Sequence, residues 1–357
     1  MNRISLLLII QLAFVTLSFS QSVVAGRNIK LPEDSVILIK SLNNLIEKRS
    51  GIDPDFQIET SALLDEMEGM KFKLVNISPI DSLDFLIQLS SFEDGTFRSS
   101  FKLIAKTQGK AYFFSSPLRR NTLNWKIKKT GDFVLYRNSK EKTPLLYRYI
   151  RTAQSFDRKL KAPVYVTKVY YHDNFTDLMG LLGEEYKIAY NGIGSLNKSW
   201  YHEGACIILI GARTNDVVAF DLHDLWHDRL HHIVNVEIIN RPIDEACAYL
   251  YGGSWGIYTW DDILQNFKQY MGADHNWLKA FDEHRKFGGV RTPLYADYVL
   301  DALICQKIEK EQGFANVITF LSCGKKEAGN ANYFKALEKI TGITRANFNV
   351  QLEKLVH

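Results

Sequence analysis

The sequence predicts an α+β protein of about two domains, and three observations lead to this prediction. The chain has 357 residues, which is enough for about two domains at roughly 150 residues each. Its composition, with 46% hydrophobic and 24% charged residues, is that of a folded globular protein. The apolar pattern changes from helices to strands in the first half of the chain and from strands to helices in the second half.

Residues 1–20 have the layout of a secretory signal peptide. Arg3 precedes an apolar stretch over residues 4–17, and the small residues Ser18 and Ser20 follow. The alternative is a transmembrane anchor, but this stretch is shorter than the ~20 residues that span a bilayer. We therefore expect cleavage after Ser20, no integral membrane segment after cleavage, and export to the periplasm or the extracellular space.

Residues 21–150 are predicted to form a small N-terminal α+β domain. Apolar residues recur at helical spacing from residue 31 to about residue 67, with a break at Gly51-Ile-Asp-Pro54. Strand-like segments follow at 101–104, 110–114, 123–127 and 132–136. Because this region gathers no histidines, cysteines or clustered carboxylates, no chemistry is assigned to it and its role stays open.

Residues 151–357 are predicted to form a second domain, in which a strand-rich lobe leads into a helical lobe. The expected strands are 164–171, 188–194 and 206–211, and the expected helices include 147–160, 294–310 and 333–340. The helix at 147–160 could belong to either domain. From residue 221 onward helices dominate, and the most unusual residues lie where the two lobes join.

The charge and the cysteines exclude several partners and cofactors. The net charge is +4 and the basic residues are scattered, so we expect no nucleic-acid partner. The cysteines are Cys206, Cys247, Cys305 and Cys323. They show no Cys-x-x-Cys spacing, which argues against a thiolate metal site. Cys206 and Cys247 lie in apolar runs and are expected to be small buried side chains, while the pairing of all four stays open.

The junction between the two lobes is rich in histidine. Four of the nine histidines fall in Asp221-Leu-His-Asp-Leu-Trp-His-Asp-Arg-Leu-His-His232. On a helix, His223 and His227 lie at i and i+4 and share one face, so that their imidazoles can converge on one ion. Glu245 follows eighteen residues after His227, at a predicted helix start with Pro242 near its first turn. Zn²⁺ needs three such protein ligands and an open position for water.

These stretches resemble the gluzincin zinc metallopeptidases, in particular the peptidase-MA-like group. The matching stretches around the metal are His223-Asp-Leu-Trp-His227 and Glu245-Ala-Cys-Ala-Tyr249, followed by Gly252-Gly253. Three later stretches, at 295–304, 313–317 and 334–342, resemble the helical C-terminal lobe of that family. The resemblance covers about residues 155–357 and implies a zincin-like domain, with a mixed sheet lobe and a helical lobe that carries the active-site helix.

The resemblance also implies a role for each matching residue. The implied Zn²⁺ ligands are His223, His227 and Glu245. Asp224 stands where the family has its catalytic glutamate, and its shorter side chain puts at risk the factor of roughly 10²–10⁴ that a general base contributes. A structural role for Asp224 is the alternative. Tyr295 and Tyr298 are candidates for the donor that stabilises the oxyanion, with core packing as the other use of either side chain.

A second histidine pair of the same form, His227-Asp-Arg-Leu-His231, lies one turn later. Only fourteen residues separate His231 from Glu245, whereas the eighteen after His227 are close to the separation usual in the family. We therefore favour His223 and His227 as ligands, and we expect His231 and His232 to be neighbouring or surface residues.

The sequence thus predicts an exported zinc-dependent peptidase that hydrolyses peptide bonds in a peptide or protein substrate. The competing interpretation is a catalytically inactive protein of the same fold that acts as a binding or structural module. The complete set of ligand residues favours the first interpretation, and the substitution at Asp224 favours the second.

Overall fold

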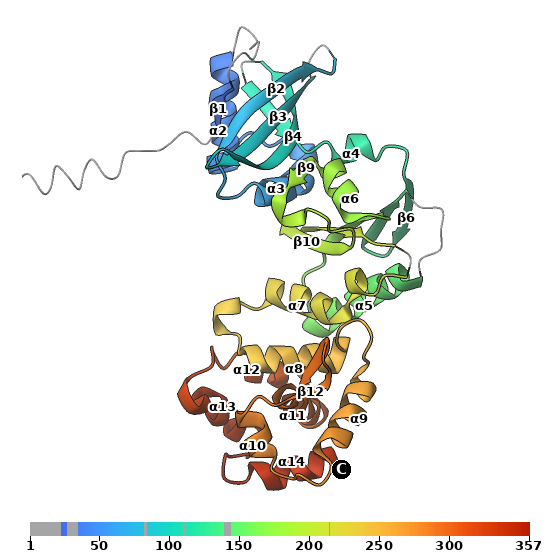
Figure 1. Ribbon diagram of the computed structural model, residues 1–357, viewed down its shortest axis with the longest axis vertical. Helices are drawn as coiled ribbons and strands as arrows, with labels where there is room; N and C mark the ends of the chain where they lie inside the picture. The colour runs from blue at the N-terminus through green and yellow to red at the C-terminus, as the bar shows by residue number, and fades with distance from the viewer. Residues whose placement is uncertain (1–22, 27–34, 82–83, 110, 139–143, 214) are drawn as a thin grey trace, which may run out of the picture. The chain divides into compact units, whose positions relative to one another are not determined.

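The computed structural model (Figure 1) confirms the α+β class. It describes residues 23–26, 35–81, 84–109, 111–138, 144–213 and 215–357. The predicted signal peptide, residues 1–20, lies outside the described residues. Among the helices in these ranges, none combines the length and the apolar character needed to cross a membrane.

The chain forms two compact units. Unit 1 takes its described residues from 1–138, 167–194 and 200–211, and unit 2 takes its own from 139–166, 195–199 and 212–357. This division differs from a single boundary near residue 150, because most of the segment 167–211 groups with the first part of the chain.

Strand pairing explains why this segment belongs to unit 1. β8 (Val166–His172) pairs in parallel with β7 (Phe133–Arg137), and β9 (Glu184–Lys187) pairs antiparallel with β4 (Thr96–Gln108). Such pairs join residues far apart in the sequence, and local periodicity carries no signal for them.

Two sheets form the core of unit 1. The first has the strand order β1-β2-β3-β4-β5, with β9 also paired to β4, and the second has the order β10-β11-β8-β7-β6. The other elements are β1 (Val23–Ala25), α2 (Ser35–Lys48), η1 (Pro54–Phe56), α3 (Gln57–Glu66), β2 (Phe72–Pro79), β3 (Asp84–Glu93), β5 (Ala111–Ser115), α4 (Leu118–Asn121), β6 (Lys126–Thr130), α6 (Phe175–Leu182), η2 (Ile188–Tyr190), β10 (Leu196–His202) and β11 (Ala205–Gly211). The helical pattern expected before residue 67 is therefore present as the two helices α2 and α3.

Two predicted strands are wrong in part. Residues 188–194 form the 3₁₀ helix η2 and a turn instead of a strand, and the strand β9 lies just before them. The cause is the turn sequence Asn191-Gly192, in which Gly192 has a φ of +79° that suits glycine and ends the extended backbone. The strand expected at 123–127 begins only at Lys126, and Leu123 is exposed in the turn after α4.

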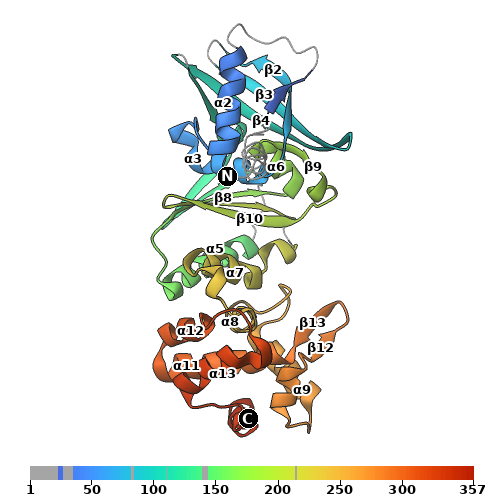
Figure 2. The same ribbon diagram turned by 90° about the vertical axis from the view of Figure 1, so that its left-hand side faces the viewer.

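Unit 2 is mostly helical. Its elements are α5 (Pro144–Leu160), η3 (Val218–Phe220), α7 (Leu222–Ile233), η4 (Val236–Ile238), α8 (Arg241–Gly252), α9 (Trp260–Met271), α10 (Trp277–Asp282), β12 (Lys286–Gly289), β13 (Thr292–Tyr295), α11 (Ala296–Gln312), α12 (Phe314–Leu321), η5 (Ala328–Asn330), α13 (Ala331–Thr341) and α14 (Phe348–Val356). Buried side chains occur on every face of α11, as expected of a helix at the centre of a core. Figure 2 shows α8, α11 and α12 close together.

The helix α7, which carries the histidines, packs on its neighbours through one of its own aromatic side chains. Trp226 is fully buried and packs edge-on against Phe156 of α5, with ring centroids 5.3 Å apart, and against Tyr251 of α8 at 4.7 Å. Trp226 therefore points away from the helix face that carries His223 and His227. Cys206 and Cys247 are fully buried, as predicted, and the Cys247 and Cys305 sulfurs lie 3.9 Å apart as free thiols.

Candidate metal centre

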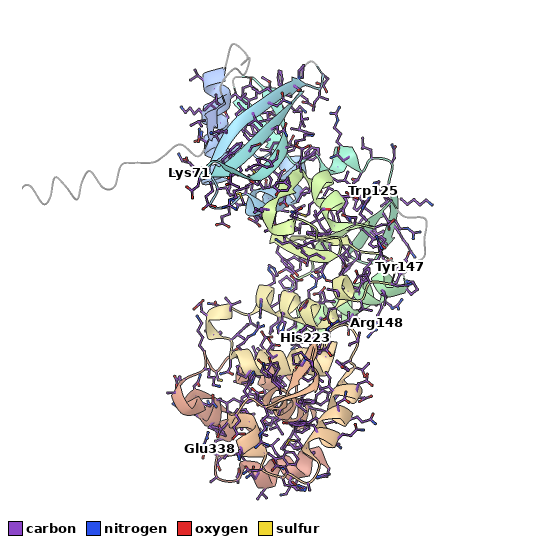
Figure 3. The ribbon with its side chains drawn as sticks, viewed as in Figure 1. Lys71, Trp125, Tyr147, Arg148, His223 and Glu338 are labelled. Carbon is purple, nitrogen blue, oxygen red and sulfur yellow. The ribbon has the colours of Figure 1, made fainter. Side chains whose placement is uncertain are left out.

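The helix α7 begins at a side-chain cap and presents two histidines on one face. Asp221 precedes α7, and its carboxylate accepts a hydrogen bond of 3.0 Å from the His223 backbone N–H. His223, labelled in Figure 3, and His227 are one turn apart, and their Nε2 atoms lie 3.2 Å apart. The predicted convergence of the two imidazoles is therefore confirmed.

Glu245 completes the group from the neighbouring helix. Pro242 lies in the first turn of α8, and Glu245 follows one turn later. Its Oε2 atom lies 3.1 Å from Nε2 of His223 and 3.7 Å from Nε2 of His227. Ligands of a tetrahedral ion at 2.0–2.2 Å are separated by about 3.3–3.6 Å, so these three atoms have the spacing of a Zn²⁺ ligand set.

The second nitrogen of each ring is held by the protein. Nδ1 of His223 donates to the Gly253 carbonyl at 3.0 Å, and Nδ1 of His227 donates to Asp244 at 2.8 Å. Nε2 of each ring therefore faces the cluster and is the atom that could bind a metal, which is the usual arrangement behind metal-bound histidines.

A missing side chain lets α8 approach α7. A Cβ on Gly252 would lie 2.7 Å from the His223 backbone nitrogen and in contact with the Leu222 carbonyl. Gly253 ends α8 with a φ of +81° and turns its carbonyl to His223. Gly252-Gly253 thus forms the turn after the helix that carries Glu245, and this turn also orients a histidine.

Asp244 links the first histidine pair to the second. This carboxylate is fully buried and accepts from His227 through one oxygen and from His231 through the other, each at 2.8 Å. His231 therefore contacts Asp244 and not Glu245. His232 is exposed and hydrogen-bonded to Tyr165 at 2.7 Å, so it lies at the surface, as expected.

The described residues contain three groups of side chains that could hold a metal ion. They are His223, His227 and Glu245; His227, His231 and Asp244; and His275, Glu353 and His357. In the second group, a metal would replace the hydrogen bonds that now orient His227. The third group is exposed, with His275 bonded to Glu353 at 2.9 Å. The first group has the tetrahedral spacing and the supporting contacts.

The electrostatics of the cluster favour a bound positive charge. Burial alone lowers the pKa of an imidazole, but hydrogen bonds with Asp244 and Glu245 outweigh burial and raise the pKa of His227 to about 9. Burial raises the pKa of a carboxyl, yet hydrogen bonds from His223 and His227 hold the pKa of Glu245 well below its usual range. Arg241 also pairs with the other Glu245 oxygen. With no metal bound, a proton therefore occupies the cluster.

A cleft of about 380 Å³ opens beside the metal group. Its lining includes His223, Asp224, Glu245, Tyr249, Tyr295 and Tyr298. Asp224 is exposed on this lining, one residue after His223. Burial raises the pKa of Tyr298, so its phenol stays protonated and able to donate a hydrogen bond at neutral pH. The structure thus brings the predicted catalytic residues and two of the predicted ligands to the same cleft.

The cleft also contains residues that the sequence analysis missed. His284 lines it and stacks on Tyr295, with centroids 4.1 Å apart. Nδ1 of His284 lies 2.7 Å from the buried carboxylate of Asp297. Asp244 was missed as well, although it stands directly beside Glu245 and an acidic pair at a helix start was a visible signal.

Comparison of this chain with known proteins gave no match to a family model, to a curated protein or to a solved structure.

Proposed function

We propose that unit 2 is a zinc-dependent peptidase of the gluzincin type, with His223, His227 and Glu245 as the metal ligands. The observation that carries this proposal is the separation of 3.1–3.7 Å between the three ligand atoms, with both Nδ1 atoms already engaged. Two histidines and one glutamate form a ligand set of catalytic zinc, which leaves a position for water or substrate. Zn²⁺ bound there supplies a Lewis acid and lowers the pKa of a bound water.

Other residues that line the cleft carry the functional groups that peptide hydrolysis needs. Asp224 is a carboxylate beside the first ligand and takes the role of general base. Tyr295 and Tyr298 supply phenol groups that can donate a hydrogen bond to a developing oxyanion. His284, oriented by Asp297, is a further donor on the same cleft.

The first test of this proposal is zinc stoichiometry by elemental analysis. We expect about one Zn²⁺ per chain at the cluster, lost in His223→Ala and in Glu245→Ala, because removing one of three ligands weakens binding by orders of magnitude. His232→Ala and His275→Ala are matched controls that remove histidines outside the cluster, and both should keep the ion. Equal zinc content in all variants, or none in the wild type, contradicts the proposal.

A second candidate is an inactive module of the same fold, and Asp224 is the observation that favours it. An aspartate is one methylene shorter than glutamate, which reduces its reach toward a metal-bound water. Zinc binding at the cluster together with the absence of hydrolysis over a broad peptide library, in wild type and in Asp224→Glu alike, would support this candidate.

We also propose that the protein is exported, on the layout of residues 1–20 alone. The mass of the protein recovered from its native cell would test this, because cleavage after Ser20 removes a defined segment. An uncleaved chain in the cytoplasm contradicts it.

A further inference from the structure

Exposed apolar side chains form part of the cleft lining. Val218 and Trp255 line the cleft and keep 61% and 44% of their surface exposed. Pro293 of β13 lines the same cleft. We call Val218, Trp255 and Pro293 the apolar lip. A single exposed apolar side chain is ordinary on a protein surface, so the way in which the lip is built matters more than its exposure.

Trp255 has a backbone conformation that bulky residues rarely adopt. Its φ is +59°, in the left-handed region, and the neighbouring Gly253 and Gly256 also have positive φ. A hydrogen-bonded pair between Ser254 and Tyr258 closes this turn, at 2.9 and 3.0 Å. Glycine would adopt the conformation of Trp255 at least cost, and strained residues of this kind concentrate at functional sites.

The indole of Trp255 is fixed in one orientation. Its Nε1 atom donates to the Pro293 carbonyl at 3.1 Å, which satisfies the only polar group of the ring. Gly256 packs closely on the segment that precedes α7. A Cβ on Gly256 would lie 2.7 Å from the carbonyl oxygen of Val217 in that segment. The turn is therefore held in place, and the indole offers only apolar surface to the cleft.

The same turn supports the metal centre. Gly253, two residues before Trp255, is the residue whose carbonyl accepts from Nδ1 of His223. His223 and Glu245 line the cleft that the apolar lip borders. A molecule that contacts the lip thus occupies the same space as a molecule that reaches the metal ligands.

We propose that the apolar lip binds a large aromatic or branched aliphatic side chain that flanks the cleaved bond of a peptide substrate. This inference rests on the peptidase function proposed above and names the substrate class of that site. Contact removes apolar surface of both partners from water, which favours binding. Asp221 and Asp224 line the same cleft and repel an acidic side chain at that position. Peptides with Phe or Leu at the flanking position should therefore be preferred over Gly, and Gly over Asp.

The test measures kcat/KM of the zinc-loaded full chain on matched peptides with Phe, Leu, Gly or Asp at the flanking positions. Trp255→Gly removes the ring and suits the positive φ, so the turn keeps its backbone. We expect kcat/KM for the Phe and Leu peptides to fall by about 10–100-fold, as for the loss of one buried large side chain, with little change for Gly peptides. Zinc content should not change, and Trp255→Phe should restore most of the preference.

A matched control is Val290→Ala, because Val290 is fully exposed at the tip of the β12–β13 hairpin and is absent from the cleft lining. This variant should behave as wild type. Cleavage with no preference for Phe or Leu, or a preference unchanged in Trp255→Gly, overturns the apolar lip and leaves the peptidase function standing.

Failure of the peptidase function gives a different result, namely no cleavage of any peptide. Calorimetric titration of the same peptides into the zinc-loaded protein then tests the lip directly. Tighter binding of the Phe peptide than of the Gly peptide, lost in Trp255→Gly, supports the lip as a binding site. Equal binding of the two peptides by wild type overturns it.

Discussion

Buried carboxylates are neutralised in different ways in the two units. In unit 1, Glu59 is fully buried and pairs with Arg119 at 2.8 Å and with Lys168 at 2.7 Å. Glu66 in the same unit pairs with Lys187 at 2.6 Å. Arginine and lysine keep their charge at neutral pH, so these carboxylates already have permanent counter-ions.

In unit 2, the two carboxylates of the candidate metal centre have histidine partners, and Arg241 pairs with both carboxylates as well. Asp244 contacts His227 and His231, and Glu245 contacts His223 and His227. A metal ion can displace the proton of an imidazole, so these counter-ions are replaceable. The comparison teaches that the partners of a carboxylate limit what it can do. In unit 1, lysine and arginine give Glu59 and Glu66 permanent counter-ions, and in unit 2 the histidines beside Asp244 and Glu245 form groups that could hold a metal.

The largest effect that we expect is on catalysis at the candidate site of unit 2. Asp224→Asn removes the proposed base, and we expect kcat/KM for peptide hydrolysis to fall by roughly 10²–10⁴ with zinc content unchanged. Asp224→Glu restores the reach of the side chain and should raise hydrolysis several-fold over wild type. Equal activity of wild type and Asp224→Asn would mean that Asp224 has a structural role.

In unit 1 the effect of removing a carboxylate should be on stability alone. Glu59→Gln leaves Arg119 and Lys168 without their counter-ion, and we expect a loss of about 3 kcal/mol from the free energy of unfolding of unit 1. Hydrogen exchange followed by mass spectrometry measures this unit by unit. Glu68→Gln, at an exposed position of the same region, is the matched control and should change stability by less than about 0.5 kcal/mol. Unchanged exchange in unit 1 would break the comparison.

Metal removal should act on unit 2 only. At a free Zn²⁺ concentration of 100 times the Kd, binding stabilises the folded unit by about 2.7 kcal/mol, and a chelator removes this stabilisation. Exchange should therefore rise in α7 and α8 on chelation while unit 1 stays unchanged. A rise of the same size in both units, or none in either, contradicts this expectation.

The remaining effect is on the pH dependence of stability, which involves a carboxylate in unit 1 and an imidazole in unit 2. Burial raises the pKa of Glu59, but Arg119 and Lys168 outweigh burial and lower it below 4.5. Its contribution to stability is thus present above pH 4.5 and is lost as the pH falls through the lowered pKa. In the metal-free protein, hydrogen bonds with Asp244 and Glu245 outweigh burial and raise the pKa of His227 to about 9. Its contribution is present below about pH 6.5 and is lost as the pH rises to about 9.

Unfolding measured against pH in the presence of a chelator checks this difference. Acid should weaken unit 1, and also unit 2 because the pKa of Glu245 is lowered there, whereas alkali should weaken metal-free unit 2. Zinc should suppress the alkaline loss, because a metal-bound imidazole no longer titrates. An alkaline loss that persists with zinc bound would show that another group is responsible.

The sequence predicts the part of the site that depends on local spacing. His223 and His227 meet because i and i+4 share a helix face, and Glu245 lies in the first turns of the next helix, as Pro242 indicates. The contact between His284 and Asp297 is different. His284 precedes the β12–β13 hairpin in the sequence and Asp297 follows it, so the two side chains meet only when the hairpin forms. No periodicity in the sequence reports such a contact.

The same limit applies to the fold. The helix α2 and the strands β4, β5, β7, β8 and β11 follow from local apolar patterns in the sequence. The placement of β9 beside β4 follows from a pairing across more than eighty positions, Ser99 with Lys187 among them. Such a pairing has no local signature, and it is what assigns the segment 167–194 to unit 1.

The contact at Gly252 limits how far apart the candidate ligands can lie. Because the backbones of α7 and α8 touch there, the two helices that carry the ligands are held at close approach. Ca²⁺ prefers six to eight oxygen ligands at 2.3–2.6 Å, a wider shell than three ligand atoms within 3.7 Å of one another can form. Competition between Zn²⁺ and Ca²⁺ should therefore be one-sided in wild type, so that a residue with no side chain acts as the size filter of the site.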